Sequence, residues 1–147
     1  DPFNFDLKYL RAKIRAKLRP VLEEVLGDKI YLALAKSATI MQLDQDFIRI
    51  EAQKVLDQIT DIKLPLQVEL NLLADLHSAV RIRVIRELLY KLGAESGKIN
   101  YQHLTTADNL FIDWHGQKGI DLPGAITIAR SMSTLDFTPT PARFKSS

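Results

Sequence analysis

The sequence predicts a mainly α-helical protein that carries a small antiparallel β-hairpin or sheet toward its C-terminus. Over most of the chain up to Trp114, apolar residues recur every three or four positions, which is the spacing of one face of an α-helix. After Gly116 the pattern changes to short runs separated by Gly119 and by the Pro123–Gly124 pair, as in strands joined by turns. The 147 residues suffice for one ordinary domain, or for a connecting helix with one small domain.

The opening stretch, DPFNFDLKYLRAKIRAKLRP, predicts a short acidic turn that leads into a strongly basic amphipathic helix. This helix is expected over residues 7–26, with Asp6 as its N-cap and Gly27 just beyond its end. Pro20 lies inside it, and because proline cannot donate a helical hydrogen bond, we expect a kink or a second helix that begins there. The apolar residues Leu7, Leu10, Ile14, Leu18 and Val21 share one side, and Lys8, Arg11, Arg15 and Arg19 share another.

A long helix is expected over residues 29–59, and its apolar residues form two lines. The first line contains Ile30, Leu34, Ala38, Met41, Ile48, Ala52, Val55 and Ile59, and the second contains Ile40, Leu43, Phe47 and Ile50. Because apolar surface on two sides of a helix needs cover on both, we expect this helix to pack against its own domain or a partner subunit.

The elements after Pro65 are shorter. Residues 66–75 fit either a strand or a helix, because their alternation of apolar and polar residues is too brief to decide. A helix is expected from Ser78, its N-cap, to Leu92, with Gly93 closing it, and another over residues 101–114.

Three strands are expected near the C-terminus. They are placed at residues 119–122, 125–130 and 134–137, with Pro123–Gly124 as a turn between the first two. From Thr138 onward the proline-broken tail is expected to fray.

The composition excludes several kinds of chemistry. The chain has no cysteine, which excludes disulfides and thiolate metal sites within it and fits a reducing cytoplasm. His77, His103 and His115 lack the spacing of metal ligands, and His103 is expected to pack or to cap its helix. No apolar run approaches the ~20 residues that span a bilayer. Phosphate-loop, dinucleotide-binding, nucleophile-elbow and zinc-protease motifs are absent, so the sequence predicts a binding surface without a catalytic or metal site of its own.

The net charge is only +2, but the charges are unevenly placed. Basic residues gather in the opening helix and between Arg81 and Arg86, while acidic residues gather in between, for example at Asp44–Asp46 and Asp57–Asp61. Such a distribution is typical of a surface that meets phosphate, and a solvated helix face is the alternative.

The order D-P-x-N-x-D-x-x-Y-x-R-x-x-[IL]-R-x-x-[LV]-x-P, from Asp1 to Pro20, resembles the segment that closes the catalytic domain of tRNA(Ile)-lysidine synthetases. The stretch LEEVLGDKIYLALAKSATIMQLDQDFI resembles the family's long helical connector, and AVRIRVIRELLYKLGA the arginine-rich helix of its substrate-binding domain. YQHLTTADNLFIDWHGQKGIDLPGAITIAR is similar to the helix and LPGG-type hairpin that follow. The resemblance covers nearly the whole chain, although Ala12, His77 and Ala125 depart from the family's pattern, and the SGGxDS loop that binds ATP is not in this chain.

The resemblance implies the part of such an enzyme that follows its catalytic domain. Residues 1–27 would end the catalytic domain and form a basic junction helix, 28–62 the connector helix, 63–137 the tRNA-binding domain, and 138–147 a flexible tail. In the family, ATP adenylates the C2 carbonyl oxygen of cytidine 34 in tRNA(Ile), and the lysine ε-amine then displaces AMP to give lysidine. This chain would hold the tRNA and would not catalyse alone, with ATP and Mg bound in the catalytic domain.

The same resemblance implies the site residues and partners. Asp1, Asn4, Arg11, Arg15 and Arg19 would lie beside the active site or the tRNA, and Arg81, Arg83, Arg86 and Arg130 would contact the tRNA. Because consecutive helical positions differ by ~100°, the first three of the latter group cannot all point one way, and at least one is expected to form a structural salt bridge. The implied partners are tRNA(Ile) and the N-terminal catalytic domain of the same chain, in the cytoplasm. The alternatives are a stand-alone helical nucleic-acid-binding module and a helical homodimerisation module.

Overall fold

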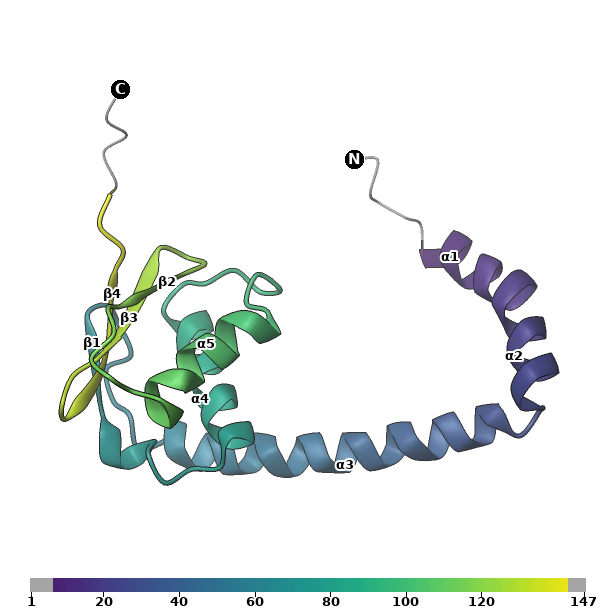
Figure 1. Ribbon diagram of the computed structural model, residues 1–147, viewed down its shortest axis with the longest axis horizontal. Coiled ribbons are helices and arrows are strands. Elements are labelled where there is room, and N and C mark those ends of the chain that lie inside the picture. The colour runs from purple at the N-terminus through teal and green to yellow at the C-terminus, as the bar shows by residue number, and fades with distance from the viewer. Residues whose placement is uncertain (1–6, 143–147) are drawn as a thin grey trace. The chain divides into compact units, whose positions relative to one another are not determined.

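The computed structural model describes residues 7–142, which form two compact units that meet in sequence between Gln45 and Asp46. The first unit holds α1 (Leu7–Lys13), the π-helical segment η1 (Ile14–Leu18), α2 (Arg19–Leu26) and the first part of α3 (Ile30–Leu56) (Figure 1). The second unit holds the last turns of α3, β1 (Leu66–Glu69), the 3₁₀-helix η2 (Leu70–Leu72), α4 (Ser78–Lys91), α5 (Tyr101–Ile112), β2 (Ile120–Leu122), β3 (Ile126–Arg130) and β4 (Thr134–Pro139). The predicted class, mainly α with a small antiparallel sheet near the C-terminus, is confirmed.

The basic opening helix forms over the predicted residues, but its winding changes partway along. At η1 the chain takes a π turn, in which the N–H of Arg19 donates to the carbonyl of Ile14. Pro20 then lies in the first turn of α2, where its missing N–H is not needed. The expected second helix at the proline is therefore confirmed, and the predicted N-cap, Asp6, lies outside the described residues.

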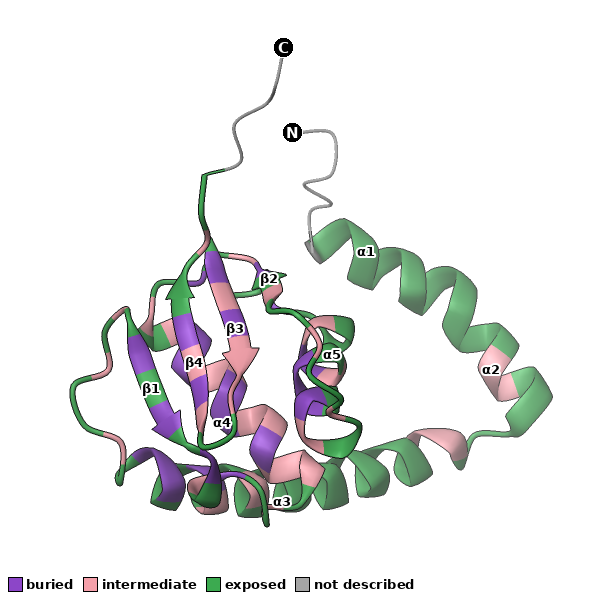
Figure 2. Cartoon of the chain, turned by 60° about the vertical axis from the view of Figure 1, so that its left-hand side comes forward, coloured by how far each residue is buried: buried purple, intermediate pink, exposed green. Residues whose placement is uncertain are grey.

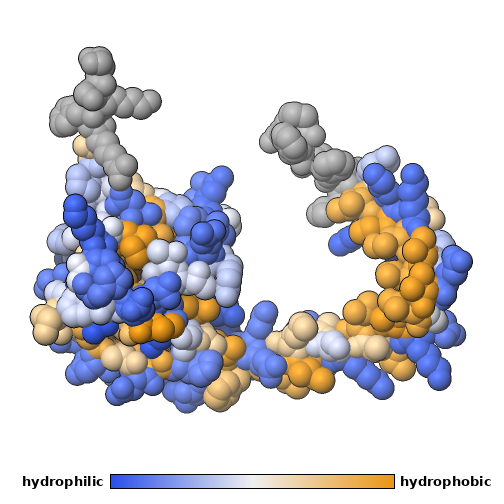
Figure 3. Space-filling model, in the orientation of Figure 1, coloured by the Kyte–Doolittle hydropathy of each residue, from blue (hydrophilic) through white to orange (hydrophobic). Residues whose placement is uncertain are grey.

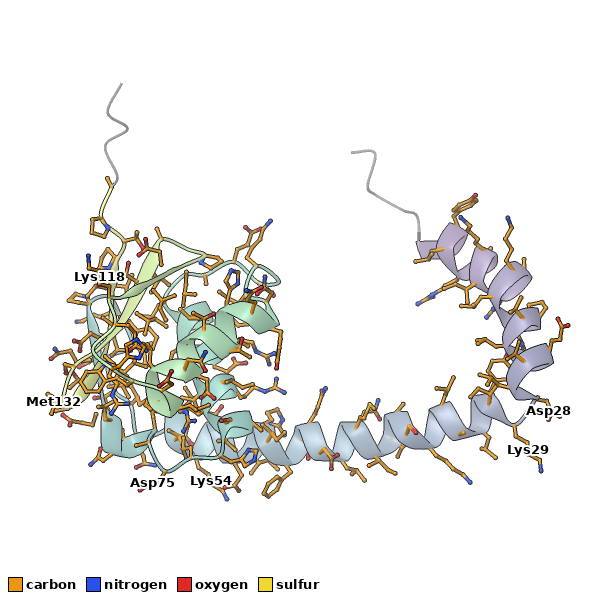
Figure 4. All side chains as sticks on the ribbon, viewed as in Figure 1. Asp28, Lys29, Lys54, Asp75, Lys118 and Met132 are labelled. Carbon is orange, nitrogen blue, oxygen red and sulfur yellow. The ribbon has the colours of Figure 1, made fainter. Side chains whose placement is uncertain are left out.

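A tight turn joins α2 to α3. Gly27 ends α2 with a φ of 80°, a left-handed conformation that glycine adopts without steric cost, and its N–H donates to the carbonyl of Glu23 at 2.9 Å. Asp28 and Lys29 complete the turn, and their side chains point away from the helices (Figure 4).

Helix α3 has buried residues only near its C-terminal end (Figure 2). Ala52, Val55 and Leu56 enter the core of the second unit, whereas Leu43 and Phe47 are 67% and 63% exposed. The helix ends three residues before the predicted end and passes into hydrogen-bonded turns. We expected both apolar lines of this helix to be covered by packing. Within residues 7–142, only its last turns are packed in this way.

The second unit is built on a four-stranded antiparallel sheet in the order β1-β4-β3-β2. The three predicted strands near the C-terminus are confirmed. The ambiguous residues 66–75 supply β1 and η2, and β1 pairs with β4 in the register Leu66↔Phe137 to Glu69↔Thr134. Strand β4 continues to Pro139, so the described chain at Thr138 and Pro139 is sheet where fraying was expected.

Helices α4 and α5 cover one face of this sheet, and the core lies between the helices and the sheet. Alternate strand residues are buried, with Ile128 of β3 directly opposite Phe137 of β4. The core face of α4 is formed by Val84, Ile85, Leu88 and Leu89, which are fully buried. Each such side chain contributes about 1.5–3 kcal/mol of hydrophobic stabilisation, which makes this unit the stable part of the described chain.

Histidines cap both of these helices. Asn100 and His103 form a capping box at the start of α5, so His103 has the capping role that was expected as one alternative. The predicted N-cap of α4, Ser78, is wrong, because His77 holds that position and its Nδ1 accepts the N–H of Ala79 at 3.1 Å. Ser78 is already helical, and its hydroxyl accepts a hydrogen bond from Arg81 at 3.2 Å.

The Pro123–Gly124 turn joins β2 to β3, as predicted. Gly124 has a φ of 90°, and a Cβ added to it would lie 2.8 Å from the Cα of Ala94. Glycine is therefore required here by both its conformation and the close backbone approach. No helix among the described residues is long and apolar enough to cross a membrane.

Candidate nucleic-acid interface

Two predicted site residues of the first unit, Arg15 and Arg19, line the same cleft. The cleft has a volume of about 330 Å³, and Ile14, Leu22 and Tyr31 complete its wall. Arg15 lies in the π turn and Arg19 at the start of α2, so both guanidinium groups are carried to one side of the helix. The expectation that these two arginines share a face is thus confirmed.

Arg19 is held in place by its neighbours. Its Nε donates to Glu23 Oε1 at 2.9 Å, and its guanidinium lies 5.0 Å from the centre of the Tyr31 ring. The phenol of Tyr31 donates back to the carbonyl of Arg19 at 3.0 Å. The hydrogen bond that Arg19 donates to Glu23 raises the pKa of Arg19, and burial of the ring raises the pKa of the Tyr31 phenol.

Arg11 and Arg15 are exposed and have no hydrogen-bond or ion-pair partner within the described part of the chain. An unpaired guanidinium at the surface retains all of its donors for an incoming phosphate. Asp1 and Asn4, which were predicted beside them, lie outside the described residues.

The same helices also expose a large apolar surface, which Figure 3 shows over α2, η1 and the adjoining part of α1. Its members are exposed large apolar side chains: Tyr9, Leu10, Ile14, Leu18, Val21, Val25 and Leu26. Contiguous exposed apolar surface of this kind marks an interaction site. The first unit thus combines cationic and apolar surface.

In the second unit, Arg81 is buried and serves the fold. Its Nε donates to Asp108 Oδ1 at 2.5 Å, and both side chains are about 95% buried. Its NH1 group donates to the carbonyls of Leu73, Ala74 and Leu76, and its guanidinium stacks on the Phe111 ring at 4.8 Å. Arg81 is the structural salt-bridge partner that was expected among the three arginines of α4, and its donors are engaged inside the protein.

Arg130 of β3 packs against aromatic side chains of α5 and the loop after it. Its guanidinium lies 4.5 Å from the centre of the Trp114 ring and 5.6 Å from that of Phe111. Its NH1 donates to the carbonyl of Leu110 at 2.6 Å, whereas its Nε is buried without a partner within residues 7–142. Phe111 therefore has Arg81 and Arg130 as its two cationic neighbours.

Arg83 and Arg86 lie half-buried on α4. Arg86 approaches Glu87 at 3.7 Å, and Arg83 has no hydrogen-bond or ion-pair partner among the described residues. The structure thus separates the three α4 arginines into one buried structural residue, one weakly paired residue and one unpaired residue.

Sequence reasoning missed the residues that arrange these arginines. Asp108, Phe111 and Trp114 recur at intervals of three, so they follow one another along α5 and into the loop beyond it. That spacing is a signal of a shared helical face, but it does not reveal which arginines the face meets. No cluster of three metal-ligating side chains is present in the described chain.

The fold and site define a class: a small domain of helices on an antiparallel sheet that contains an arginine–aromatic stack, preceded along the chain by helices with exposed cationic and apolar surface. Comparison with known proteins makes the class specific. Residues 69–135 match the family model described as the TilS substrate binding domain.

Relatives match over most of this chain. It is 36% identical over 125 residues to tRNA(Ile)-lysidine synthase of Thermobifida fusca, covering 85% of this chain and 38% of the relative. The enzyme of the same name from Streptomyces coelicolor is 33% identical over 130 residues (88% and 36%), and that from Leifsonia xyli is 35% identical over 144 residues (95% and 42%). The chain is thus similar to tRNA(Ile)-lysidine synthases over most of its own length, and it spans about two fifths of the length of these relatives.

Proposed function

We propose that this chain is the tRNA-binding portion of a tRNA(Ile)-lysidine synthase. The observation that carries the proposal is the match of residues 69–135 to the TilS substrate binding domain, together with arginines in both units that have no partner within residues 7–142. The proposed activity of the whole enzyme is the conversion of cytidine 34 of tRNA(Ile) to lysidine with ATP and lysine. ATP and Mg would be bound by an N-terminal catalytic domain of the same polypeptide, in the cytoplasm.

The proposed role of the described residues is to hold the tRNA while chemistry takes place elsewhere. Lys and Arg side chains that neutralise phosphates supply affinity that does not depend on sequence. Arg11, Arg15 and Arg83 are the proposed phosphate contacts, because no internal partner within residues 7–142 engages them. Arg86 and Arg130 are also proposed to contact the tRNA, with fewer donors to offer because each has a partner within the protein. We assign Arg81 a structural role.

Binding of labelled tRNA(Ile) across a salt series tests this proposal. The logarithm of the association constant should fall linearly with the logarithm of the salt concentration, and Arg15→Ala should reduce the slope by about one. The matched control is Arg49→Ala, because Arg49 is an exposed arginine that is paired with Asp46 at 2.7 Å. The proposal is wrong if the protein does not bind tRNA, or if it binds with no dependence on salt.

One observation favours a second candidate function, that of a homodimerisation module. Helix α3 exposes the large apolar side chains of Ile40, Leu43 and Phe47, which a second copy of the chain could cover. Sedimentation at several protein concentrations separates the two candidates. Self-association that Leu43→Glu abolishes, without any binding of tRNA, would support the module in place of the tRNA-binding role.

A further inference from the structure

A second cleft, of about 300 Å³, lies between α5 and strand β2. The helical wall presents Gln102, His103 and Thr106, with Asn100 just before them, and the strand wall includes Ile120 and Asp121. The cleft therefore combines hydrogen-bonding side chains on both walls with an apolar one. It belongs to the second unit, within the residues that match the substrate binding domain.

The capping box fixes the chemistry that His103 offers to this cleft. Nδ1 of His103 accepts the backbone N–H of Asn100 at 3.1 Å, while Asn100 Oδ1 accepts the backbone N–H of His103 at 3.0 Å. Because Nδ1 is an acceptor, the neutral imidazole carries its proton on Nε2. That N–H has no acceptor within the described part of the chain, so the ring is a pre-oriented donor.

The opposite wall supplies an acceptor. Asp121 lies on β2, and its Oδ1 accepts the hydroxyl of Thr127 at 2.8 Å, which steadies the carboxylate in the sheet. A carboxylate here opposes the binding of a free phosphate or another small anion. The cleft thus favours a neutral ligand whose edge carries donors and acceptors.

We propose that this cleft binds the base of an unpaired nucleotide of the RNA. The edge of a nucleobase carries donors beside acceptors, and sequence-specific RNA recognition mainly uses unpaired bases that can leave the stack. The volume lies at the lower end of the range for small-molecule pockets, which suits one nucleoside and excludes a duplex. Ile120 offers apolar contact to the ring. This inference rests on the proposed function, since it takes the RNA to be the tRNA substrate.

Three substitutions separate base recognition from stability and from charge. His103→Glu keeps the capping box, because a glutamate at the third helical position also accepts the N-cap N–H, but it replaces the Nε2 donor by an acceptor. His103→Gln keeps the cap and restores an amide donor. Asn109→Glu adds the same charge at an exposed position of α5 that does not line the cleft.

Affinity for labelled tRNA(Ile) and chemical probing of its unpaired nucleotides are measured with all three variants and the unaltered protein. We expect His103→Glu to weaken binding about tenfold more than Asn109→Glu, because a hydrogen bond to the base is lost and an acceptor is left unpaired. His103→Gln should stay within about threefold of the unaltered protein. In the unaltered complex one unpaired nucleotide should be protected, and His103→Glu should remove that protection.

The result that overturns the inference is equal weakening by His103→Glu and Asn109→Glu with an unchanged protection pattern. In that case the tRNA-binding function stands and the cleft has no part in it. Failure of the unaltered protein to bind tRNA would instead refute the proposed function itself, so the two failures are distinguishable.

Discussion

Replacing Arg81 by methionine is expected to lower the free energy of unfolding of the second unit by about 3–5 kcal/mol, the usual cost of removing one partner of a buried ion pair. The substitution keeps an unbranched side chain of similar reach but leaves the carboxylate of Asp108, which is 5% exposed, without its cation. It also removes the NH1 group that donates to the carbonyls of Leu73, Ala74 and Leu76. Because this network joins α4 to α5 and to the segment before α4, its loss affects the packing of both helices.

Urea unfolding followed by the fluorescence of Trp114 measures this change, because Trp114 is the single tryptophan and lies in the second unit. The control is Arg83→Met, the same substitution two residues along α4 at a half-buried arginine without a partner within residues 7–142, and it should stay within about 0.5 kcal/mol. The double variant Arg81→Met, Asp108→Leu should recover part of the loss, since it removes the unpaired charge. The reasoning fails if Arg81→Met costs no more than Arg83→Met, or if the double variant recovers nothing.

The remaining predictions concern the β2–β3 turn and Tyr31. Ala125 has a φ of 56°, a left-handed conformation that strains alanine but not glycine. Ala125→Gly should therefore stabilise the second unit by about 0.5–1 kcal/mol, which is the relieved strain less the greater entropy that glycine gives the unfolded chain. Gly124→Ala should destabilise it by about 2 kcal/mol or more, and equal effects of the two in Trp114-monitored unfolding would contradict this. Burial, and after it the nearby Glu23, raise the pKa of Tyr31, so the folded first unit holds the phenol proton more tightly than the unfolded chain does. The stability of the first unit should therefore fall as the pH rises from the ordinary tyrosine pKa through the raised one. The 295 nm titration difference between the protein and Tyr31→Phe checks this, and a midpoint at or below the ordinary value would oppose it.

The arginines show how far the sequence predicts the site. Arg81, Arg83 and Arg86 share one helix and similar neighbours, so helical geometry predicts only that they diverge. Burial distinguishes them: Arg81 meets Asp108, which is 27 residues away in sequence, and its charge is satisfied inside the core. Arg15 and Arg19 are a simpler case, because a shared helical face brings them together and needs no distant partner.

The sequence by itself determines the helices, the turn at Pro123–Gly124 and the antiparallel pairing of β2, β3 and β4, since periodicity, caps and short connections are local properties. Tertiary structure alone decides that residues 66–69 are a strand, because only pairing with β4, some seventy residues later, satisfies their backbone groups. It also decides which arginine of α4 is buried. These outcomes depend on groups that are distant in sequence and close in space, and no local pattern records such neighbours.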